Sequence, residues 1–408
     1  MSEQDCDVLI AGGGLVGMSL ALALAGLRVI VVDKAPMAME QRSADERHLA
    51  LSEVSCRILT ELNVLQALGA DAEPIRSIHV SSAGDFGAAR WSATDLGRAQ
   101  FGVVAPAKRL LRALQQRVLI SPGIALRASA TVLNAQTHSN GVDALIEDPQ
   151  GNCTIRAKLL VIADGADSSL RSLAGIEVTR HDYQTSAICC VVEPEREHQG
   201  TAFERFTRNG LVAMLPQSQG RCAAVFIVDS TPAGQLMQMP NAAFLHELQA
   251  AFGYRLGRLR HCGLRVAYPL RRVLAQTLVA PRQVLIGNAA QSVHPVGAQG
   301  FNLGLRDAAE LAQALLAAQR NASANTADFG AADLLAAYAS SREKDRAATT
   351  QLSHALALST TLHARPVGWL RSLALIAADR IKPLAEHLQL AGMGYRGATP
   401  GLDRGLIT

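Results

Sequence analysis

The sequence has few aromatic and few charged residues, and its cysteines follow no ligand or disulfide pattern. Of the 408 residues, 4% are aromatic and 18% are charged, and the net charge of +4 is spread without a basic block, so we expect no nucleic-acid partner. The seven cysteines are an odd number and include no Cys-x-x-Cys pair, which argues against a disulfide framework or a zinc site. We therefore expect no metal and a reducing, cytoplasmic compartment.

The sequence also lacks the positive charge that a secretory signal needs before its apolar run. Residues 8–27 form an uncharged stretch of about the length of a membrane span, but Glu3, Asp5 and Asp7 precede it. Three glycines and a second apolar run indicate a buried strand-helix-strand unit instead. Hydrophobic residues make up 49% of the chain, which is enough for a large core, and the length suggests two closely joined domains.

What the sequence does contain is a glycine motif, Gly12-x-Gly14-x-x-Gly17, in the context of a dinucleotide-binding unit. The surrounding elements are predicted as a strand at 8–11, a helix at 18–25 and a second strand at 29–32. Gly12 permits a tight turn, Gly14 lets the backbone approach a pyrophosphate at the helix N-terminus, and Gly17 allows close packing. Asp33 ends the second strand and can accept hydrogen bonds from a ribose. A glycine-rich turn without a ligand is the alternative.

Two further motifs follow predicted buried strands. Asp164-Gly165 and Gly287-Asn288 each come directly after a short apolar run. These runs predict strands at residues 159–163 and 284–286. Because open parallel sheets bind ligands at the carboxyl ends of their strands, we expect both motifs to lie beside the first one.

The middle of the chain has the period-two alternation of an antiparallel sheet. We predict this sheet over residues 181–278, with residues 76–104 joining it, and interpret it as one wall of a substrate cavity. The adjacent Cys189 and Cys190 should point to opposite faces of a strand as core residues. The later chain is predicted to be helical at residues 308–318 and 331–358.

Together, the three motifs resemble those of the class A flavoprotein monooxygenases, the para-hydroxybenzoate hydroxylase type. The stretch from Gly287 to Pro295, followed by residues 299–304, is similar to the 2-polyprenyl-6-methoxyphenol hydroxylase signature of the ubiquinone-biosynthesis branch. Residues 202–207, 213–216 and 267–270 resemble the same branch. The resemblance covers the chain to about residue 355.

This resemblance implies an α/β fold with a Rossmann-like FAD-binding domain, an antiparallel substrate domain and a helical C-terminus. The implied segments are 1–75, 105–180 and 279–355 for the FAD-binding domain, 76–104 and 181–278 for the substrate domain, and 356–408 for the C-terminal helical segment.

The resemblance also implies which residues contact FAD. They are Gly12, Gly14, Gly17, Asp33, Arg47, Lys108, Asp164, Gly165, Arg171, Gly287, Asn288, Gln299, Gly300, Phe301 and Asn302. Asp164 would lie near the pyrophosphate and the approaching nicotinamide, with a helix-capping turn as the alternative, and Arg171 would fix that motif. A solvated surface charge is the alternative for Arg47, and the contact given to Lys108 can fall on Arg109 instead.

The third motif departs from the family at two places. Most relatives have an acid where this chain has Asn288, which keeps an acceptor for the ribityl hydroxyls but loses the charge. The branch usually reads Pro-x-Ala-Gly-Gln-Gly, whereas this chain has Gly297 and Ala298 in exchanged order. If position 298 needs a positive φ, Ala298 is strained by about 1 kcal/mol or more.

In such enzymes NADH or NADPH reduces FAD, O₂ adds at C4a to give a hydroperoxide, and a phenol ring attacks its distal oxygen. The implied substrate is 2-polyprenyl-6-methoxyphenol. A hydrogen-bond acceptor beside the phenol would speed the attack, and we predict His294 for this role, with a structural histidine as the alternative. Tyr183, Met214 and Pro216 are expected in the cavity by resemblance alone.

Two other functions stay open. One is a related flavoprotein that reduces or oxidises a prenyl group without inserting oxygen. The other is a non-catalytic scaffold that keeps FAD within a biosynthetic complex, for which only Asn288 and the exchanged Gly297 and Ala298 speak.

The C-terminal tail has apolar residues at helical spacing. Trp369, Leu373 and Ile381 alternate with Arg371 and Arg380, a pattern that suits a membrane surface or a partner groove. A helix packed on its own core is the alternative. We expect a polyprenyl phenol and O₂ as substrates, and a homo-oligomer, a multienzyme complex or peripheral contact with the inner membrane.

Overall fold

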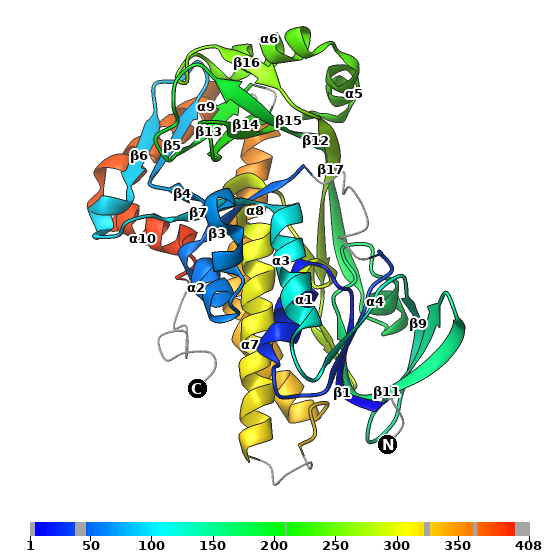
Figure 1. Cartoon of the computed structure of the whole chain (residues 1–408). Helices are drawn as coiled ribbons and strands as arrows, with labels where there is room; N and C mark the ends of the chain where they lie inside the picture. Colours follow the sequence, from blue (N-terminus) through cyan, green and yellow to red (C-terminus); the bar gives the residue numbers. More distant parts are fainter. Residues whose placement is uncertain (1–4, 37–45, 209, 322–326, 362–364, 396–408) are drawn as a thin grey trace.

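The structure is a computed structural model that describes residues 5–36, 46–208, 210–321, 327–361 and 365–395. Two large β-sheets lie one above the other in Figure 1, and the long helices α7 and α8 run beside the lower one. A small three-stranded sheet is formed by strands between residues 48 and 106. The mixed α/β class and the helical C-terminus predicted from the sequence are confirmed.

The first sheet contains the four strands predicted at residues 8–11, 29–32, 159–163 and 284–286. Its strands are β1 (Asp5–Ala11), β2 (Val29–Val32), β8 (Ile124–Arg127), β9 (Thr131–Thr137), β10 (Val142–Asp148), β11 (Gly151–Ile162), β18 (Val279–Ala280) and β19 (Gln283–Leu285). The order is β18-β19-β11-β1-β2-β8, and the pairs β11–β19, β1–β11, β1–β2 and β2–β8 are parallel. The carboxyl ends of β19, β11 and β1 are therefore neighbours, which brings the three motifs together.

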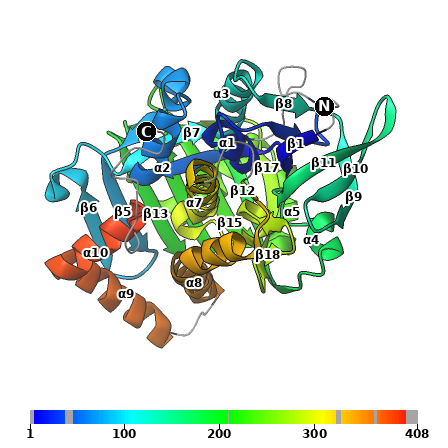
Figure 2. The same cartoon turned by 90° about the horizontal axis from the view of Figure 1, so that it is seen from below.

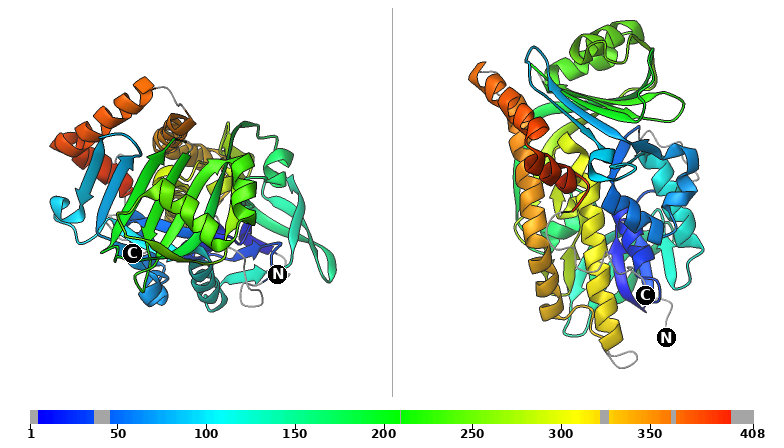
Figure 3. Two further views of the ribbon diagram at one scale, coloured as in Figure 1. Left: turned by 90° about the horizontal axis from the view of Figure 1, so that it is seen from above. Right: turned by 90° about the vertical axis from the view of Figure 1, so that its left-hand side faces the viewer.

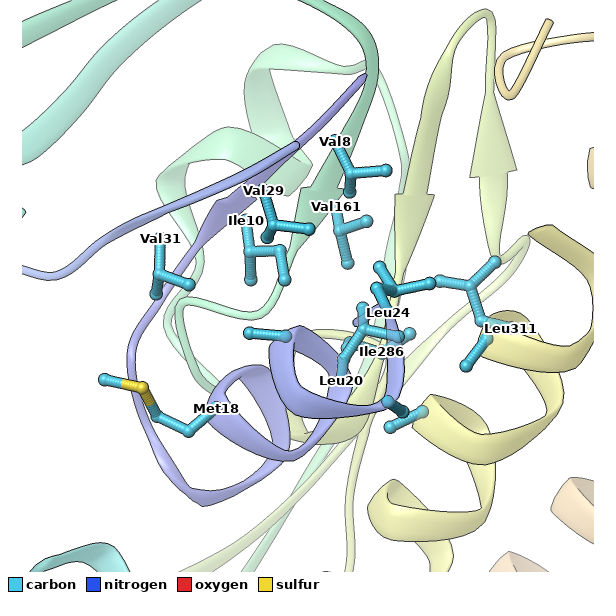
Figure 4. Packing of buried hydrophobic residues seen from close by; sticks show 14 of the residues in the cluster. Val8, Ile10, Met18, Leu20, Leu24, Val29, Val31, Val161, Ile286 and Leu311 are labelled. Atoms are coloured by element: carbon cyan, nitrogen blue, oxygen red, sulfur yellow. The ribbon is translucent and has the colours of Figure 1, made fainter. Parts of the chain in front are cut away.

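The core of this part consists of aliphatic side chains between the sheet and two helices. Helix α1 (Leu15–Ala23) lies on the sheet, and α7 (Gln299–Asn321) packs against α1. Figure 4 shows Leu20 and Leu24 beside Ile286 and close to Leu311 of α7. At roughly 25 cal/mol for each Å² of buried apolar surface, this packing is what stabilises the motif-bearing edge.

The second sheet is mostly antiparallel, as predicted. Its strands are β5 (Ser77–Ser82), β6 (Ala88–Ser92), β12 (Val178–Pro194), β13 (Thr201–Thr207), β14 (Gly210–Pro216), β15 (Cys222–Asp229), β16 (Leu259–Cys262), β17 (Val266–Ala275) and β20 (Gln291–Ser292). The order is β20-β17-β12-β15-β14-β13-β5-β6, with β16 on β12, and the pair β5–β13 is parallel. β5 and β6, from the predicted stretch 76–104, thus extend this sheet.

Two helices that were not predicted interrupt the segments of the antiparallel sheet over residues 181–278. Helices α5 (Ser230–Gln238) and α6 (Asn241–Phe252) cover the outer face of the second sheet, above it in Figure 3. Leu245, Leu248 and Phe252 point into a core cluster with Met214 of β14. Their spacing of three to four residues is helical, and this period decides the local structure.

The other elements connect the two sheets. They are β3 (His48–Ser52), β4 (Glu73–Ile75), β7 (Gly102–Pro106), α2 (Glu53–Glu61), α3 (Ala107–Leu119), α4 (Ser169–Leu173) and the 3₁₀ turns at Leu65–Asp71, Ala93–Leu96, Gly287–Ala289 and Val296–Ala298. β3, β4 and β7 form the small third sheet.

Three helices end the described chain. Helix α8 (Ala332–Thr361) packs on α7, and α9 (Arg365–Arg380) and α10 (Lys382–Gly392) lie beside β5 and β6 in Figure 2. The tail therefore folds as two helices separated at Ile381, because Pro383 can start a helix but not continue one. Within the described ranges, none of the helices has the length and apolarity to cross a bilayer.

Candidate active site

A cavity of about 640 Å³ lies between the motif-bearing edge of the first sheet and the inner face of the second. From the motifs and the loops that follow them it is lined by Gly14, Ala163, Gly165, Gly287, Asn288, Pro295, Gly297, Ala298, Gly300 and Phe301. From the second sheet it is lined by Ile78, Ala187, Cys189, Ala202, Phe203, Glu204, Leu211, Ala213, Leu215, Val225, Ile227, residues 268–271 and Ser292. The size is that of a site for a cofactor portion or a small molecule.

The first motif leaves open space where a phosphate would bind. Gly12 has φ +114°, and a Cβ there would lie 2.3 Å from the backbone oxygen of Ala163. A Cβ on Gly17 would lie 2.0 Å from the backbone oxygen of Gly12, so both glycines are required by packing. A Cβ on Gly14 would meet no described atom within 4 Å, although Gly14 is the N-cap of α1 and no side chain caps that helix. The free N–H groups and the open space fit a pyrophosphate.

Asp33 lies at the end of β2, next to this turn. Its Oδ2 accepts a hydrogen bond from the N–H of Gly13, and its Oδ1 accepts one of 2.7 Å from the N–H of Ala35. These contacts hold the carboxylate in place. Each oxygen keeps a further acceptor site, so the position fits the predicted ribose contact.

The second motif contains an acid with one buried oxygen, Asp164, and a buried cation, Arg171. Oδ1 of Asp164 is inaccessible and has no hydrogen-bond partner among the described residues. Burial raises the pKa of Asp164, and the hydroxyl of Ser168 opposes this rise. Gly165 next to it has φ +100° and lines the cavity, which leaves room for a ligand. An unsatisfied buried carboxyl oxygen at this edge indicates a missing donor, such as a group on a bound cofactor.

Arg171 joins the second motif to the third. Its side chain is fully buried, and burial lowers its pKa. Nη1 donates a hydrogen bond of 2.9 Å to the backbone oxygen of Ala289, and Nη2 donates one of 3.0 Å to the backbone oxygen of Ala166. The predicted fixing role therefore acts through backbone carbonyls, and Arg171 itself does not line the cavity.

The third motif presents its amide side chain outward. Asn288 is exposed and lines the cavity between the buried Gly287 and Ala289. The N–H of Gly287 donates 3.3 Å to Oδ2 of Asp307 on α7, and a Cβ on Gly304 would lie 3.0 Å from the Cα of Gly287. Asn288 is thus available as the predicted ribityl contact.

A network of buried ion pairs supports this turn from behind. Nε of Arg342 lies 2.8 Å from Oδ1 of Asp307, and Nε of Arg306 lies 2.8 Å from Oδ2 of Asp345. Arg342 also pairs with Asp345 at 2.8 Å. Burial acts against ionisation, but Arg306 and Arg342 hold the pKa of Asp345 at about 2. Arg306 and Asp307, which belong to the extended motif, therefore join α7 to α8.

The loop before α7 has a positive φ at position 298, the case in which alanine is expected to be strained. Gly297 has φ +69° and Ala298 has φ +50°. The N–H of Ala298 donates 2.8 Å to the oxygen of Pro295. Position 298 therefore does adopt a left-handed backbone, and alanine there is strained.

The residues after this loop divide between cavity and framework. Gly300 and Phe301 line the cavity, whereas Gln299 is 9% exposed and donates to the oxygen of Gly297 at 3.0 Å. Oδ1 of Asn302 accepts from Ser52 N–H at 2.9 Å and from the Ser55 hydroxyl at 2.7 Å. Its Nδ2 donates to two backbone oxygens, those of Ala50 and Ala298. The Asn302 side chain therefore fastens β3 to α7 and does not reach the cavity.

Arg47 and Lys108 occupy different environments. Arg47 lines the cavity, and its Cζ lies 5.4 Å from the ring centre of Tyr268, so the cavity contact fits better than a solvated charge. Nζ of Lys108 instead lies 2.9 Å from Oε1 of Glu46 and outside the cavity lining. Arg109 pairs with Asp71 at 3.2 Å. Neither of these two basic residues lines the site.

His294 does not have the surroundings of a catalytic base. It is 2% exposed, its Nδ1 accepts a hydrogen bond of 3.2 Å from the N–H of Val296, and it is absent from the cavity lining. Its ring packs edge-on against Tyr183 with centroids 5.0 Å apart. Burial lowers the pKa of His294 to about 4, so the ring is neutral at pH 7. These contacts favour the structural alternative.

The expected cavity residues Tyr183 and Met214 also lie elsewhere. The hydroxyl of Tyr183 is 2.9 Å from Nδ1 of His354, and Tyr183 is absent from the cavity lining. Met214 is fully buried on the outer face of the second sheet, under α5 and α6. Strand alternation gives the inner face of β14 to Leu211, Ala213 and Leu215. Pro216 is not among the lining residues.

Glu204 is a cavity residue that the sequence analysis did not identify. It lies on β13 opposite Ala213 of β14, and its Oε1 accepts a hydrogen bond of 3.3 Å from the N–H of Gly297. Burial raises its pKa, and the Gly297 N–H opposes the rise. The sequence could have indicated it only through strand parity, since Ala202 and Glu204 share a face.

Comparisons with known proteins agree with this site. The family described as "FAD binding domain" matches residues 5–353. The ubiquinone hydroxylase UbiL of Rhodospirillum rubrum is 35% identical over 396 residues, covering 96% of this chain and 90% of its own. The 3-demethoxyubiquinol 3-hydroxylase of Escherichia coli is 30% identical over 400 residues, covering 97% and 100%. The solved p-nitrophenol 4-monooxygenase PnpA of Pseudomonas putida DLL-E4 has a TM-score of 0.78 at 18% identity, covering 96% and 99%.

The family match spans most of the chain, and the relatives are aligned over nearly their whole length. The motifs quoted from the sequence lie within the matched residues and meet at one cavity. This chain therefore belongs to the FAD-binding family of flavoprotein aromatic hydroxylases, enzymes that use FAD as their cofactor.

Proposed function

We propose that this protein hydroxylates the aromatic ring of a polyprenyl phenol in ubiquinone biosynthesis, with 2-polyprenyl-6-methoxyphenol as the first candidate substrate. The observation that carries the proposal is the cavity, which joins the three glycine motifs to an aliphatic wall of the second sheet. Relatives named as ubiquinone hydroxylases support the pathway. An apolar wall opposite a flavin site suits an aromatic ring with an isoprenoid substituent.

The motif residues would hold the cofactor in this proposal. The N-terminus of α1 at Gly14 would bind the pyrophosphate, Asp33 the ribose and Asn288 the ribityl hydroxyls. Gly297 and Gly300 would let the loop and the start of α7 approach the flavin ring, where helix N–H groups favour negative charge. When bound, FAD supplies the activation of O₂ that ring hydroxylation needs.

The second sheet would orient the substrate and exclude water. Leu211, Ala213 and Leu215 of β14 and Val225 and Ile227 of β15 form a continuous aliphatic surface. A phenol ring on this surface is kept from bulk water, which limits the loss of activated oxygen to solvent. Arg47, above Tyr268, stands at the cavity as a cation for the cofactor or for a reduced nicotinamide.

The test is oxygen incorporation. Protein reconstituted with FAD is incubated with NADH or NADPH, ¹⁸O₂ and a short-chain 2-prenyl-6-methoxyphenol, and the product is analysed by mass spectrometry. One ¹⁸O atom in the ring product supports the proposal. Consumption of reduced nicotinamide with a changed prenyl group and no label supports the prenyl-reductase alternative. Bound FAD without any turnover on this phenol or on a demethoxyubiquinol supports the scaffold.

We further propose that α9 contacts a membrane surface peripherally. Trp369, Leu370 and Leu373 are 70%, 66% and 57% exposed, and the exposed Arg380 and Lys382 follow them. Apolar side chains flanked by cations suit an anionic bilayer surface. Co-sedimentation with vesicles containing anionic lipid should fall when Trp369 and Leu373 are changed to serine. Unchanged binding by that variant would direct attention to a protein partner in a multienzyme complex.

A further inference from the structure

We propose that Glu204 receives the hydrogen bond of the substrate's phenolic hydroxyl and takes its proton during ring hydroxylation. This assignment rests on the proposed function, because it needs a phenol in the cavity. It replaces His294, whose ring is buried outside the cavity lining.

The strand geometry places the Glu204 side chain on the substrate wall. β13 and β14 are antiparallel, with Glu204 opposite Ala213 and Phe203 opposite Met214. Ala213 lines the cavity, and Met214 belongs to the cluster under α5 and α6. Since neighbouring side chains on paired strands share a face, Glu204 projects to the cavity side.

The carboxyl group stands between the substrate wall and the flavin-side loop. Oε1 accepts the hydrogen bond of 3.3 Å from the N–H of Gly297, in the loop that precedes α7. Among the described residues, Oε2 has no hydrogen-bond partner. One oxygen is thus fixed to the loop that lines the cofactor side, and the other is available to a ligand in the cavity.

Glu204 is also the single carboxylic acid among the described residues that line the cavity. The other titratable lining residues are Arg47, His48, Cys189, Tyr268 and Arg271. His48 already uses both ring nitrogens, with Glu46 O at 3.1 Å and Gln217 Nε2 at 3.0 Å. Arg271 pairs with Asp182 at 3.4 Å, and an arginine cannot accept a proton. A proton acceptor is therefore supplied by Glu204.

The local environment suits the task. Burial raises the pKa of Glu204 above its ordinary value. The hydrogen bond from the N–H of Gly297 stabilises the carboxylate and opposes part of this rise in pKa. A carboxylate with a raised pKa is a stronger base toward a phenol than an ordinary surface carboxylate. A weaker base would leave the ring less electron-rich.

The proposed step balances with the reagents of the proposed function. The phenol O–H bond breaks, the proton goes to Glu204, and its electron pair raises the electron density of the ring. A ring carbon forms the new C–O bond with one atom of O₂ and then loses its own proton as aromaticity returns. The other oxygen atom leaves as water, with the two electrons supplied by the reduced nicotinamide. Glu204 releases its proton after the product forms.

The first measurement reports the hydrogen bond to the phenol without turnover. Oxidised, FAD-loaded enzyme is titrated with 2-methoxyphenol, and the ultraviolet difference spectrum reveals how the phenolic hydroxyl is hydrogen-bonded. The variants are Glu204→Gln, Glu204→Asp and, as a matched control, Glu197→Gln at an exposed site. We expect the phenol band to shift to longer wavelength in the wild type and the control, to stay unshifted in Glu204→Gln and to shift partly in Glu204→Asp.

The second measurement is the ratio of hydroxylated product to nicotinamide oxidised, over a range of pH. Glu204→Gln should keep its FAD yet lose about 10²-fold or more in hydroxylation, with the missing oxygen found as H₂O₂. The acid limb of the kcat/KM profile should disappear with it. Glu204→Asp should recover part of the activity, which a loss of folding would not allow.

The two proposals fail in different ways. If Glu204→Gln hydroxylates within about 3-fold of the wild type and shifts the phenol band equally, Glu204 has no such role. Absence of a shifted phenol band in the wild type also overturns the assignment. A wild type that shows a Glu204-dependent shift but hydroxylates no phenol would overturn the proposed function alone.

Discussion

Nη1 of Arg171 donates a hydrogen bond of 2.9 Å to the backbone oxygen of Ala289, so the second and third glycine motifs are joined directly. Residue 171 belongs to α4, which follows the strand β11, and residue 289 follows β19. The sheet makes these strands neighbours, and the arginine fixes the turns beyond their ends.

Replacing Arg171 by methionine should weaken FAD binding more than it affects the sheet. The change leaves the oxygens of Ala289 and Ala166 without their donors, at a cost of about 1–3 kcal/mol for each buried group. We expect at least a tenfold rise in the Kd for FAD, measured by fluorescence quenching. Arg180→Met removes a nearby exposed charge and serves as the control. Equal FAD affinity in both variants would contradict the bridging role.

Gly14→Ala and Gly17→Ala should separate cofactor binding from folding. An added Cβ meets nothing at Gly14, so Gly14→Ala should cost the unliganded protein under about 1 kcal/mol and still lower FAD affinity strongly. A Cβ at Gly17 lies 2.0 Å from the oxygen of Gly12, so Gly17→Ala should destabilise the protein itself by about 1–3 kcal/mol. Urea unfolding without FAD and FAD titration give the two quantities. A Gly14→Ala protein with wild-type FAD affinity would place the pyrophosphate elsewhere.

The strained loop predicts opposite effects at two adjacent positions. Ala298→Gly removes the strain of a left-handed alanine, which is about 1–2 kcal/mol. The glycine also raises the entropy of the unfolded chain, which opposes folding, so we expect a net stabilisation of up to about 1 kcal/mol. Gly297→Ala places a second Cβ at φ +69° and should destabilise by about 1 kcal/mol, although no described atom lies near it. Differential scanning of the unliganded variants measures both signs. A destabilised Ala298→Gly protein would mean that the methyl group contributes packing that outweighs the strain.

His294 predicts an acid-dependent loss of stability. Burial lowers its folded-state pKa to about 4, below the ordinary 6.5, so the unfolded chain binds the proton more tightly. Its contribution is complete above pH 6.5 and is lost as the pH falls toward 4, by about 3 kcal/mol. His294→Asn keeps an acceptor for the N–H of Val296 and should remove this part of the slope in urea unfolding between pH 7 and 4.5. His79, whose pKa burial also lowers to about 4, should keep part of the slope in the variant.

The same variant decides between the two roles considered for His294. A structural histidine predicts that His294→Asn still hydroxylates, with the FAD content of the wild type. A folded, flavin-loaded variant that loses hydroxylation while its pH slope stays unchanged would restore His294 as the catalytic group.

The parts of the fold that depend on local period were predictable from sequence. The strand before Gly12, the helix after it and Asp33 at the end of β2 all follow from apolar runs and glycine spacing. Cys189 and Cys190 do point to opposite faces, one into the cavity and one under α5 and α6. Helices α5 and α6 were not predicted, because each is a short segment of helical apolar spacing that lies between strands.

The site was less predictable because face and direction depend on tertiary contacts. Alternation placed Met214 on one side of β14, but only pairing with β13 and the helices above shows which side faces the cavity. The motif located His294 in the chain, whereas its ring direction depends on Tyr183 and the N–H of Val296. Glu204 lies between Phe203 and Arg205 on β13, and only the register of this strand with β14 identifies it as a cavity residue.

The buried pairs between α7 and α8 also fix when this protein can finish folding during synthesis. Asp307 of α7 accepts a hydrogen bond from the turn at Gly287 and forms an ion pair with Arg342 of α8. Arg306 of α7 likewise pairs with Asp345 of α8. A buried Asp307 or Arg306 without its ion-pair partner would cost several kcal/mol, so the turn at Gly287 cannot become ordered before α8 has packed against α7. A nascent chain can therefore pair β1, β2, β8 and β11 early, but it cannot complete the flavin-binding edge until residue 345 has left the ribosome. The third glycine motif is therefore among the last parts of the molecule to become rigid.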